Sequence, residues 1–227
     1  MTYTLDESMH FSNDLSSGEP QLSATSAALL GQLAWRAQTP YELSNAMQRN
    51  LRYFWPRAAS HVYREVKRLS ARGWTRAERG RTGLRPRTVY HITPEGRHAL
   101  QGWLALAPGG TSLEHEPLLR VFLASSGTPG DLRRALARAR ADAEQMLAVG
   151  TPLAHEYLRG IHEFQQEVHV RALTFDYLYN WARFTIAWTD RCQEEIGRWR
   201  DVSPSPAKQR RALARIAAIV GADARPS

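Results

Sequence analysis

One helix with two chemically different sides constrains the fold of this chain most. Residues 58–72 have helical periodicity and are followed by Gly73, a residue that commonly ends a helix. One side of the helix is apolar and carries Ala59, Val62, Val66 and Leu69, with Tyr63 at its edge and Glu65 at the flank. The opposite side carries donors and positive charge but no carboxylate: Arg57, Ser60, Arg64, Lys67, Arg68 and, more peripherally, His61. Such a helix must bury its apolar side in a core, and its basic side is then free to meet an anionic partner.

Shorter elements surround this helix in an informative order. Residues 26–35 and 41–47 have helical spacing, and Thr39-Pro40 provides a cap and first turn for the second of them. Residues 74–79 and 86–92 predict two strands, joined by a hairpin tip at 80–85. Thr93-Pro94-Glu95-Gly96 then caps a helix that continues through residue 106. Three helices, a hairpin and a closing helix are typical of a winged helix-turn-helix, which we expect over residues 23–107 as a DNA-binding domain.

The distribution of charge agrees with this expectation. Residues 23–110 hold 14 Lys and Arg and four Asp and Glu. The net charge of this segment, +10, exceeds the net charge of +8 of the whole chain. Residues 111–200 are close to neutral, with 11 basic and 12 acidic residues. A concentrated basic segment is typical of a nucleic-acid-binding module. The hairpin contributes Arg81, Arg85 and Arg87, which we expect to meet phosphates or the minor groove.

The second half of the chain predicts a helical dimerisation domain over residues 114–200. A short helix is predicted at 116–123. A longer helix follows, which is capped by Thr128-Pro129-Gly130-Asp131 and runs to residue 149. Residues 150–152 interrupt it. A final helix at 168–200 is rich in aromatic residues, and Leu178, Trp181, Thr185, Trp188 and Cys192 follow one stripe along it. Aromatic residues at this spacing usually pack in a core or a dimer interface.

The predicted fold is therefore mainly α with a small β-hairpin wing: a winged helix-turn-helix plus a C-terminal α-helical dimerisation domain. We expect residues 1–22, which carry four acids and no base, to be a disordered arm. Residues 201–227 begin with Ser203-Pro204-Ser205-Pro206 and predict a flexible tail with at most one weak helical patch.

Several motifs in the first half resemble the PadR family of transcriptional regulators. They are Pro40-Tyr41-Glu42-Leu43, Phe54-Trp55-Pro56 followed by Ser60-His61-Val62-Tyr63, Lys67-Arg68-Leu69 with Gly73, and the run from Arg85-Pro86-Arg87 through Thr93-Pro94-Glu95-Gly96-Arg97. The sequence departs from the family in having Pro40 in place of glycine and Arg64 in place of proline, and the second change lets Arg64 reach DNA. The resemblance implies a dimeric regulator, usually a repressor that releases a palindromic operator on binding a small effector. Some members of the family hold flat aromatic effectors between tryptophans, which makes Trp181 and Trp188 the candidate effector-binding residues.

The candidate DNA-binding residues come from three predicted elements. Tyr41 belongs to this set, although tyrosines such as Tyr41, Tyr63 and Tyr90 more often pack in a core than contact a base. The set comprises Arg57, Ser60, His61, Arg64, Lys67, Arg68, Arg81, Arg85, Arg87 and Tyr41. Because B-form DNA accepts a helix in its major groove, arginine and lysine of the third helix can contact guanine edges there, and serine can contact either base.

Two other functions remain open. The same charge would suit a nonspecific architectural DNA-binding protein. A metal-dependent enzyme could use the segment that contains His155 and His162, but seven residues of helix separate neighbouring histidines by ~10.5 Å, too far for one metal ion. The chain has a single cysteine, Cys192, and lacks a glycine-rich phosphate loop and a serine elbow, so we expect neither an enzyme nor a cofactor. It also lacks a signal-peptide pattern and an apolar run long enough to span a membrane, so we expect a cytoplasmic protein that joins the nucleoid when bound to DNA.

Overall fold

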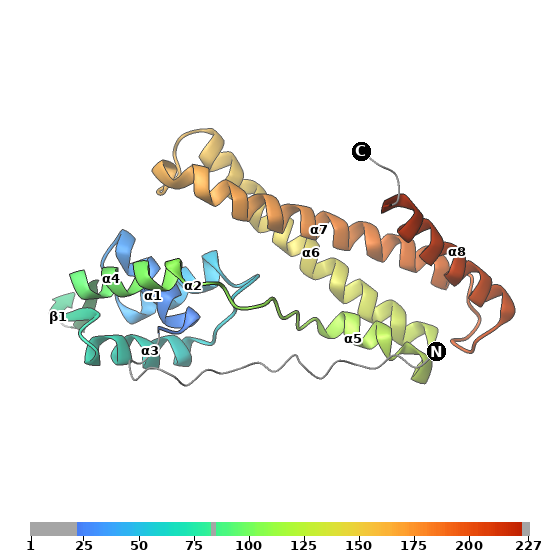
Figure 1. The fold of residues 1–227 in the computed structure, drawn as a ribbon, viewed down its shortest axis with the longest axis horizontal. Helices are drawn as coiled ribbons and strands as arrows, with labels where there is room; N and C mark the ends of the chain where they lie inside the picture. The colour runs from blue at the N-terminus through green and yellow to red at the C-terminus, as the bar shows by residue number, and fades with distance from the viewer. Residues whose placement is uncertain (1–21, 83–84, 224–227) are drawn as a thin grey trace. The chain divides into compact units, whose positions relative to one another are not determined.

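The computed structural model describes residues 22–82 and 85–223, and the chain divides into two compact units, residues 1–110 and 111–227 (Figure 1). Unit 1 contains α1 (Ala24–Trp35), α2 (Pro40–Asn50), α3 (Ala59–Ala71), β1 (Thr75–Thr82), β2 (Arg85–Ile92) and α4 (Pro94–Ala105). Unit 2 contains α5 (Glu116–Phe122), α6 (Pro129–Leu158), α7 (Val168–Gly197) and α8 (Pro206–Asp223), with short 3-10 turns at Ala124–Ser126 and Gln165–Glu167. The prediction of a mainly helical fold with a winged helix-turn-helix is confirmed.

Local capping explains where the helices of unit 1 begin. The Ser23 hydroxyl accepts a hydrogen bond from the backbone N–H of Ser26 at the start of α1. Thr39 and Glu42 form a reciprocal capping box at the start of α2, with Pro40 in the first turn. The Thr93 hydroxyl caps α4 by accepting from the N–H of Gly96. The sequence predicted the starts of α2 and α4 at these caps, whereas α1 begins at Ala24, two residues before the predicted start at residue 26.

The core of unit 1 lies where α1, α2 and α3 meet (Figure 1). Its fully buried side chains come from all three helices: Leu29, Leu30, Leu33, Leu43, Met47, Val62, Val66 and Leu69. At Gly96, in the first turn of α4, a Cβ atom would lie 2.1 Å from the carbonyl oxygen of Trp74. Only glycine therefore allows α4 to approach the start of the hairpin so closely.

The hairpin is longer than the sequence predicted. β1 and β2 pair antiparallel from Thr75 opposite Ile92 to Thr82 opposite Arg85, so the strands occupy most of the predicted tip at 80–85. The two residues between them, 83 and 84, lie outside the described residues. Gln38 forms a backbone bridge with Tyr90, which ties β2 to the segment between α1 and α2. The backbone of the wing is therefore attached to the segment that leads into α2.

In unit 2, α6 and α7 are long helices that lie side by side in antiparallel directions (Figure 1). The predicted interruption at 150–152 is wrong, since α6 continues through Pro152 to Leu158. A proline inside a helix costs one backbone hydrogen bond, and packing on a neighbouring helix can offset that cost. Gly150 supports this explanation, because a Cβ atom at this position would already lie 3.5 Å from the Phe175 ring of α7.

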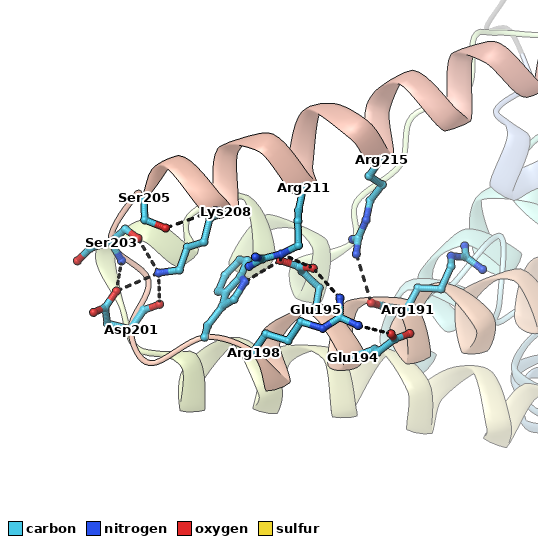
Figure 2. Close-up of polar contacts among 11 residues, drawn as sticks. Arg191, Glu194, Glu195, Arg198, Asp201, Ser203, Ser205, Lys208, Arg211 and Arg215 are labelled. Carbon is cyan, nitrogen blue, oxygen red and sulfur yellow. Dashed lines mark hydrogen bonds and ion pairs between the residues drawn. The ribbon is translucent and has the colours of Figure 1, made fainter.

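The predicted flexible tail is also wrong over most of its length, because Pro206–Asp223 forms the 18-residue helix α8. Its first half is fixed to α7 and the following loop by charged groups (Figure 2). Arg211 Nε donates to Glu195 Oε1 at 2.9 Å, and Lys208 Nζ donates to Asp201 Oδ1 at 3.0 Å and to the Ser203 carbonyl at 2.7 Å. The predicted disordered arm, by contrast, lies outside the described residues except for Leu22, which is buried. Among the described residues, no helix is both long and apolar enough to cross a membrane.

Candidate nucleic-acid interface

The two sides of α3 lie as the periodicity of the sequence predicted. Val62, Val66 and Leu69 are fully buried against the other helices of unit 1. The outward side exposes Ser60, Tyr63, Arg64, Lys67 and Arg68. Ala59, which the helical spacing placed on the apolar side, is exposed because it lies in the first turn, beyond the edge of the core.

The exposed side of α3 is rich in hydrogen-bond donors. A shallow hollow on it is lined by Tyr63, Arg64, Lys67, Arg68 and Ala71. Within residues 22–82 and 85–223, no ion pair joins Arg64 or Lys67 to a carboxylate. These two cations are therefore available to an external anion, and the Ser60 hydroxyl lies one turn before Arg64 on the same side.

Arg57 occupies a different environment from the other basic residues near α3. Its Nε donates to the Thr25 hydroxyl at 3.2 Å, its Nη1 donates to the Pro56 carbonyl at 2.6 Å, and its guanidinium carbon lies 4.5 Å from the centroid of Trp55. Trp55 Nε1 donates to the same Thr25 hydroxyl at 3.2 Å. Arg57 is thus half-buried and joins the approach to α3 to the first helix, rather than lying with Arg64 and Lys67.

Among the residues of α3, the predicted burial was least accurate for Glu65. The spacing put it at the flank of the helix, but it is 5% exposed and lies among the core residues. Its carboxylate is satisfied by accepting from the Ser26 hydroxyl of α1 and from Arg68 Nη1 at 3.2 Å. Helical spacing alone could not reveal this position, because the buried Glu65 depends on a serine 39 residues away.

The remaining polar candidates of the helices are spread over two elements. His61 is half-buried, and its Nδ1 is a buried atom without a hydrogen-bond partner among the described residues. Tyr41 lies on α2 and is 67% exposed, and Tyr63 is 40% exposed. The interpretation of these two tyrosines as core residues is wrong, whereas Tyr90 is buried as that interpretation expected.

The candidate arginines Arg81 and Arg87 of the wing differ in their surroundings. Arg81 is exposed on β1, whereas the side chain of Arg85 lies outside the described residues. Arg87 Nη2 donates to Glu42 Oε1 at 3.1 Å, which joins β2 to the first turn of α2. The pKa of Glu42 is lowered, mainly because the backbone N–H and the hydroxyl of Thr39 donate to its carboxylate, with a further contribution from Arg87.

The candidate effector residues lie seven positions apart on α7. Both Trp181 and Trp188 are half-buried. Trp188 packs against the buried cluster of Leu132, Leu136 and Ile196, so part of its apolar surface already has a role in the core of unit 2. Trp181 lies outside that cluster.

The histidine segment has a geometry that differs from one continuous helix. His155 is exposed near the end of α6, whereas His162 follows the helix and stacks on Tyr157 with ring centroids 3.8 Å apart. His162 Nδ1 accepts from the N–H of Phe164 at 3.0 Å. In the described part of the chain, no group of three or more His, Cys, Asp or Glu side chains is arranged to hold a metal ion.

Comparison with known proteins gives two family matches that follow the two units. The family model described as Transcriptional regulator PadR-like family matches residues 29–102, and the model described as Virulence activator alpha C-term matches residues 115–197. The probable transcriptional regulator Rv1176c of Mycobacterium tuberculosis is 33% identical over 79 residues, which are 34% of this chain and 42% of that protein. The chain thus matches less than half the length of this curated relative.

Solved structures of similar fold include PadR of Bacillus subtilis in two complexes. The complex with operator DNA has a TM-score of 0.61 at 19% identity and covers 75% of this chain and 97% of that one. The complex with p-coumaric acid has a TM-score of 0.57 at 20% identity, with the same coverage of both chains. At these identities the similarity establishes a shared fold across both units.

Proposed function

The chain belongs to the PadR-like family of transcriptional regulators, and we propose that it is a sequence-specific DNA-binding regulator that acts as a homodimer on a two-fold operator. The observation that carries this proposal is the outward side of α3, which exposes a hydroxyl and three cations while its opposite side forms the core. A helix of this kind fits the major groove of B-form DNA, where its donors can reach base edges.

The exposed residues divide by position into two roles. Ser60 and Arg64 lie in the first half of α3, the half that contacts base edges in helix-turn-helix proteins, so we assign them to sequence recognition. Lys67 and Arg68 on α3, Tyr41 on α2 and Arg81 on the wing suit phosphate contacts, which position a protein on the duplex.

The remaining candidates are assigned differently. Arg57 and Arg87 are already bonded within the protein, so we assign them to holding α3 and the wing in place. His61 lies beside Ser60 and is assigned a secondary contact through the edge of its ring that does not face the core. Arg85 stays a candidate phosphate contact from its sequence position alone.

We assign dimerisation to unit 2. Its helices expose large apolar side chains that a single chain leaves in water, among them Leu119 and Phe122 of α5 and Leu173 and Phe184 of α7. Large exposed apolar patches usually mark interfaces. The proposed regulation is repression that a small aromatic effector relieves, with Trp181 and Trp188 as the candidate binding residues and the related PadR complex with p-coumaric acid as its support. We also propose that the protein is not an enzyme and that it acts on nucleoid DNA in the cytoplasm.

Selection of bound duplexes from a random pool, followed by footprinting, tests the proposal. We expect one short palindrome to be enriched, with half-sites about one helical turn or ~34 Å apart. A variant with alanine at Ser60, Arg64 and Lys67 should lose this enrichment, whereas the exposed Arg138→Ala change on α6 should keep it. Equal protection of all duplexes would favour an architectural protein, and metal retained after chelation together with metal-dependent turnover would favour the enzyme alternative.

A further inference from the structure

The buried carboxylate of Glu65 is an unusual feature for the DNA-facing helix of a regulator. Its side chain is 6% exposed, although it lies among residues that approach a polyanion in the proposed function. Burying a carboxylate is unfavourable unless it is paired and hydrogen-bonded. Glu65 meets this condition with two contacts, one on each oxygen: the Ser26 hydroxyl of α1 on Oε1 and Arg68 Nη1 on Oε2.

The first of these contacts joins α1 to α3, and the second joins Glu65 to Arg68 within α3. Ser26 is buried and is also within 2.9 Å of the Ser23 hydroxyl, which caps α1, so the position of Ser26 is itself fixed. Glu65 therefore joins a fixed point on α1 to the middle of α3. Arg68, three residues further along, is 61% exposed and lines the hollow on the outward side of α3 together with Arg64 and Lys67.

We infer that Glu65 is a positioning residue for DNA recognition: it holds the guanidinium of Arg68 in one place on the outward side of α3, and so fixes the register of the helix on the duplex. This inference rests on the proposed function. An arginine side chain loses considerable conformational freedom when it binds a phosphate, and a carboxylate that already orients it removes part of that cost. A phosphate contact made by a fixed arginine also sets where the neighbouring Arg64 meets the base edges.

Lys67 shows what the pairing changes. Lys67 and Arg68 are both exposed cations of the same half of α3, but within the described residues only Arg68 pairs with a carboxylate. Lys67 should therefore contribute attraction to any duplex. The charge of Arg68 is offset by Glu65. Compared with Lys67, Arg68 should therefore contribute less to the attraction of duplex DNA of any sequence and more to discrimination between sequences.

A cycle of four proteins separates these roles: the wild type, Glu65→Gln, Arg68→Gln and the double variant. Relative to the wild type, the net charge near the DNA changes by +1 in Glu65→Gln, by −1 in Arg68→Gln and by zero in the double variant. Since one additional cation adds about 0.9 to the salt slope per protomer, Glu65→Gln should bind random duplex roughly five- to tenfold more tightly at 0.1 M salt, and the double variant should bind it like the wild type. Discrimination between operator and random duplex should fall roughly three- to tenfold in all three variants, because each loses the fixed Arg68.

The decisive comparison is between the double variant and the wild type, which have equal net charge. Lower discrimination in the double variant, by no more than in either single variant, supports positioning by Glu65 through Arg68. Equal discrimination in these two proteins would overturn the inference and reduce Glu65 to charge compensation. Losses that add up from the two single variants would also overturn it, since Glu65 would then act independently of Arg68.

Two controls keep this test separate from folding and from the proposed function. Thermal unfolding and the fraction of active protein are measured for each variant, and Arg68→Gln, which leaves the contact between Ser26 and Glu65 intact, decides the matter if Glu65→Gln does not fold. Lys67→Ala should weaken binding to operator and random duplex by the same factor. A wild type that binds all duplexes equally would reject the proposed function and this inference together, whereas a discriminating wild type with an equally discriminating double variant rejects the inference alone.

Discussion

Arg64 lies in the first half of α3, on the side opposite Val62 and Val66, and its guanidinium is exposed. If it contacts a guanine edge, Arg64→Ala should cost ~1–3 kcal/mol of binding free energy on the operator and weaken the preference at one base pair of each half-site. The exposed Arg81 of the wing is the matched control, because a lost phosphate contact should weaken binding to operator and random duplex alike. Titrations of both variants on both duplexes at several salt concentrations measure the difference. An equal loss on the two duplexes for Arg64→Ala would make it a phosphate contact.

Glu42 has a stabilising role that should depend on pH. Its pKa is lowered by Thr39 and, to a smaller extent, by Arg87, so the folded state favours the charged carboxylate. A group with a lowered folded pKa stabilises the protein above its unfolded pKa, and this contribution is lost as pH falls through the folded value. Glu42→Gln should therefore reduce the free energy of unfolding by roughly 0.5–1 kcal/mol at pH 7, from the capping box and a partly exposed ion pair.

Denaturant titrations of the wild type and Glu42→Gln at pH 7, 5 and 3 test this expectation. The gap between the two proteins should be unchanged from pH 7 to 5 and should narrow at pH 3. Arg87→Ala should remove a smaller part of the stabilisation and leave the Thr39 contacts in place. A gap that stays constant down to pH 3 would contradict a charge-dependent role for Glu42.

At the scale of elements, the attachment of α8 to α7 is made by polar groups, whereas its apolar residues Leu213, Ile216, Ile219 and Val220 are exposed. Since most helical stability in proteins comes from tertiary contacts, α8 should depend on these polar bonds. Arg211→Ala removes the bond to Glu195, a carboxylate whose pKa is lowered mainly by Trp199 and then by Arg211. Loss of a charge-assisted bond of ~1 kcal/mol should speed amide hydrogen exchange in α8 roughly fivefold and leave α3 unchanged.

The neighbouring Arg210 is exposed and provides the control for this measurement. Arg210→Ala should leave exchange in α8 close to that of the wild type. If the two variants behave alike, the Glu195 contact does not hold the helix.

The outcome for the elements shows what the sequence could and could not predict. Helices with local caps and clear periodicity, such as α2, α3 and α4, were predicted with their ends within a few residues, because Thr39, Thr93 and Gly73 act within one turn. The continuity of α6 through Pro152 and the length of α8, for which at most a weak helical patch was predicted, were missed, since both depend on packing or ion pairs with α7. The same distinction applies at the interface: the exposed side of α3 follows from spacing, whereas the bonds of Glu65 and Arg87 join residues far apart in the sequence.

The aromatic content of α7 supports a test for an effector. A flat phenolic acid should quench tryptophan fluorescence and weaken operator binding if it stacks on Trp181, which is half-buried and lies outside the buried cluster of unit 2. Trp181→Phe should reduce the quenching. Trp103→Phe is the control and should preserve it, because Trp103 lies on α4 and packs against the core of unit 1. p-Coumaric acid is a suitable first probe, because the related PadR structure contains it. A screen of aromatic acids that changes neither fluorescence nor operator affinity would argue against this role.

At the scale of the whole molecule, two recognition helices must be held together to contact a two-fold operator. The near-neutral unit 2 is suited to this task, because two copies can approach without strong repulsion and can bury the apolar side chains that α5 and α7 expose. Phe122 is 82% exposed on α5, which is far more than a large aromatic side chain usually shows in a monomer. Removing such a side chain from water would favour association by about 1.5–3 kcal/mol per protomer.

We therefore expect sedimentation of the wild type at micromolar concentration to give a homodimer without DNA, and Phe122→Asp to shift it toward monomer. An aspartate at an apolar interface brings an unpaired charge into the contact from each protomer, which is strongly unfavourable. Leu104→Asp is the control, since Leu104 is similarly exposed but lies on α4 of unit 1. The monomeric variant should bind an isolated half-site like the wild type does, but it should lose the additional affinity for the full operator, because its second α3 is no longer tethered. If Phe122→Asp stays dimeric, α5 lies outside the interface; a wild type that sediments as a monomer at this concentration would contradict dimerisation through unit 2 altogether.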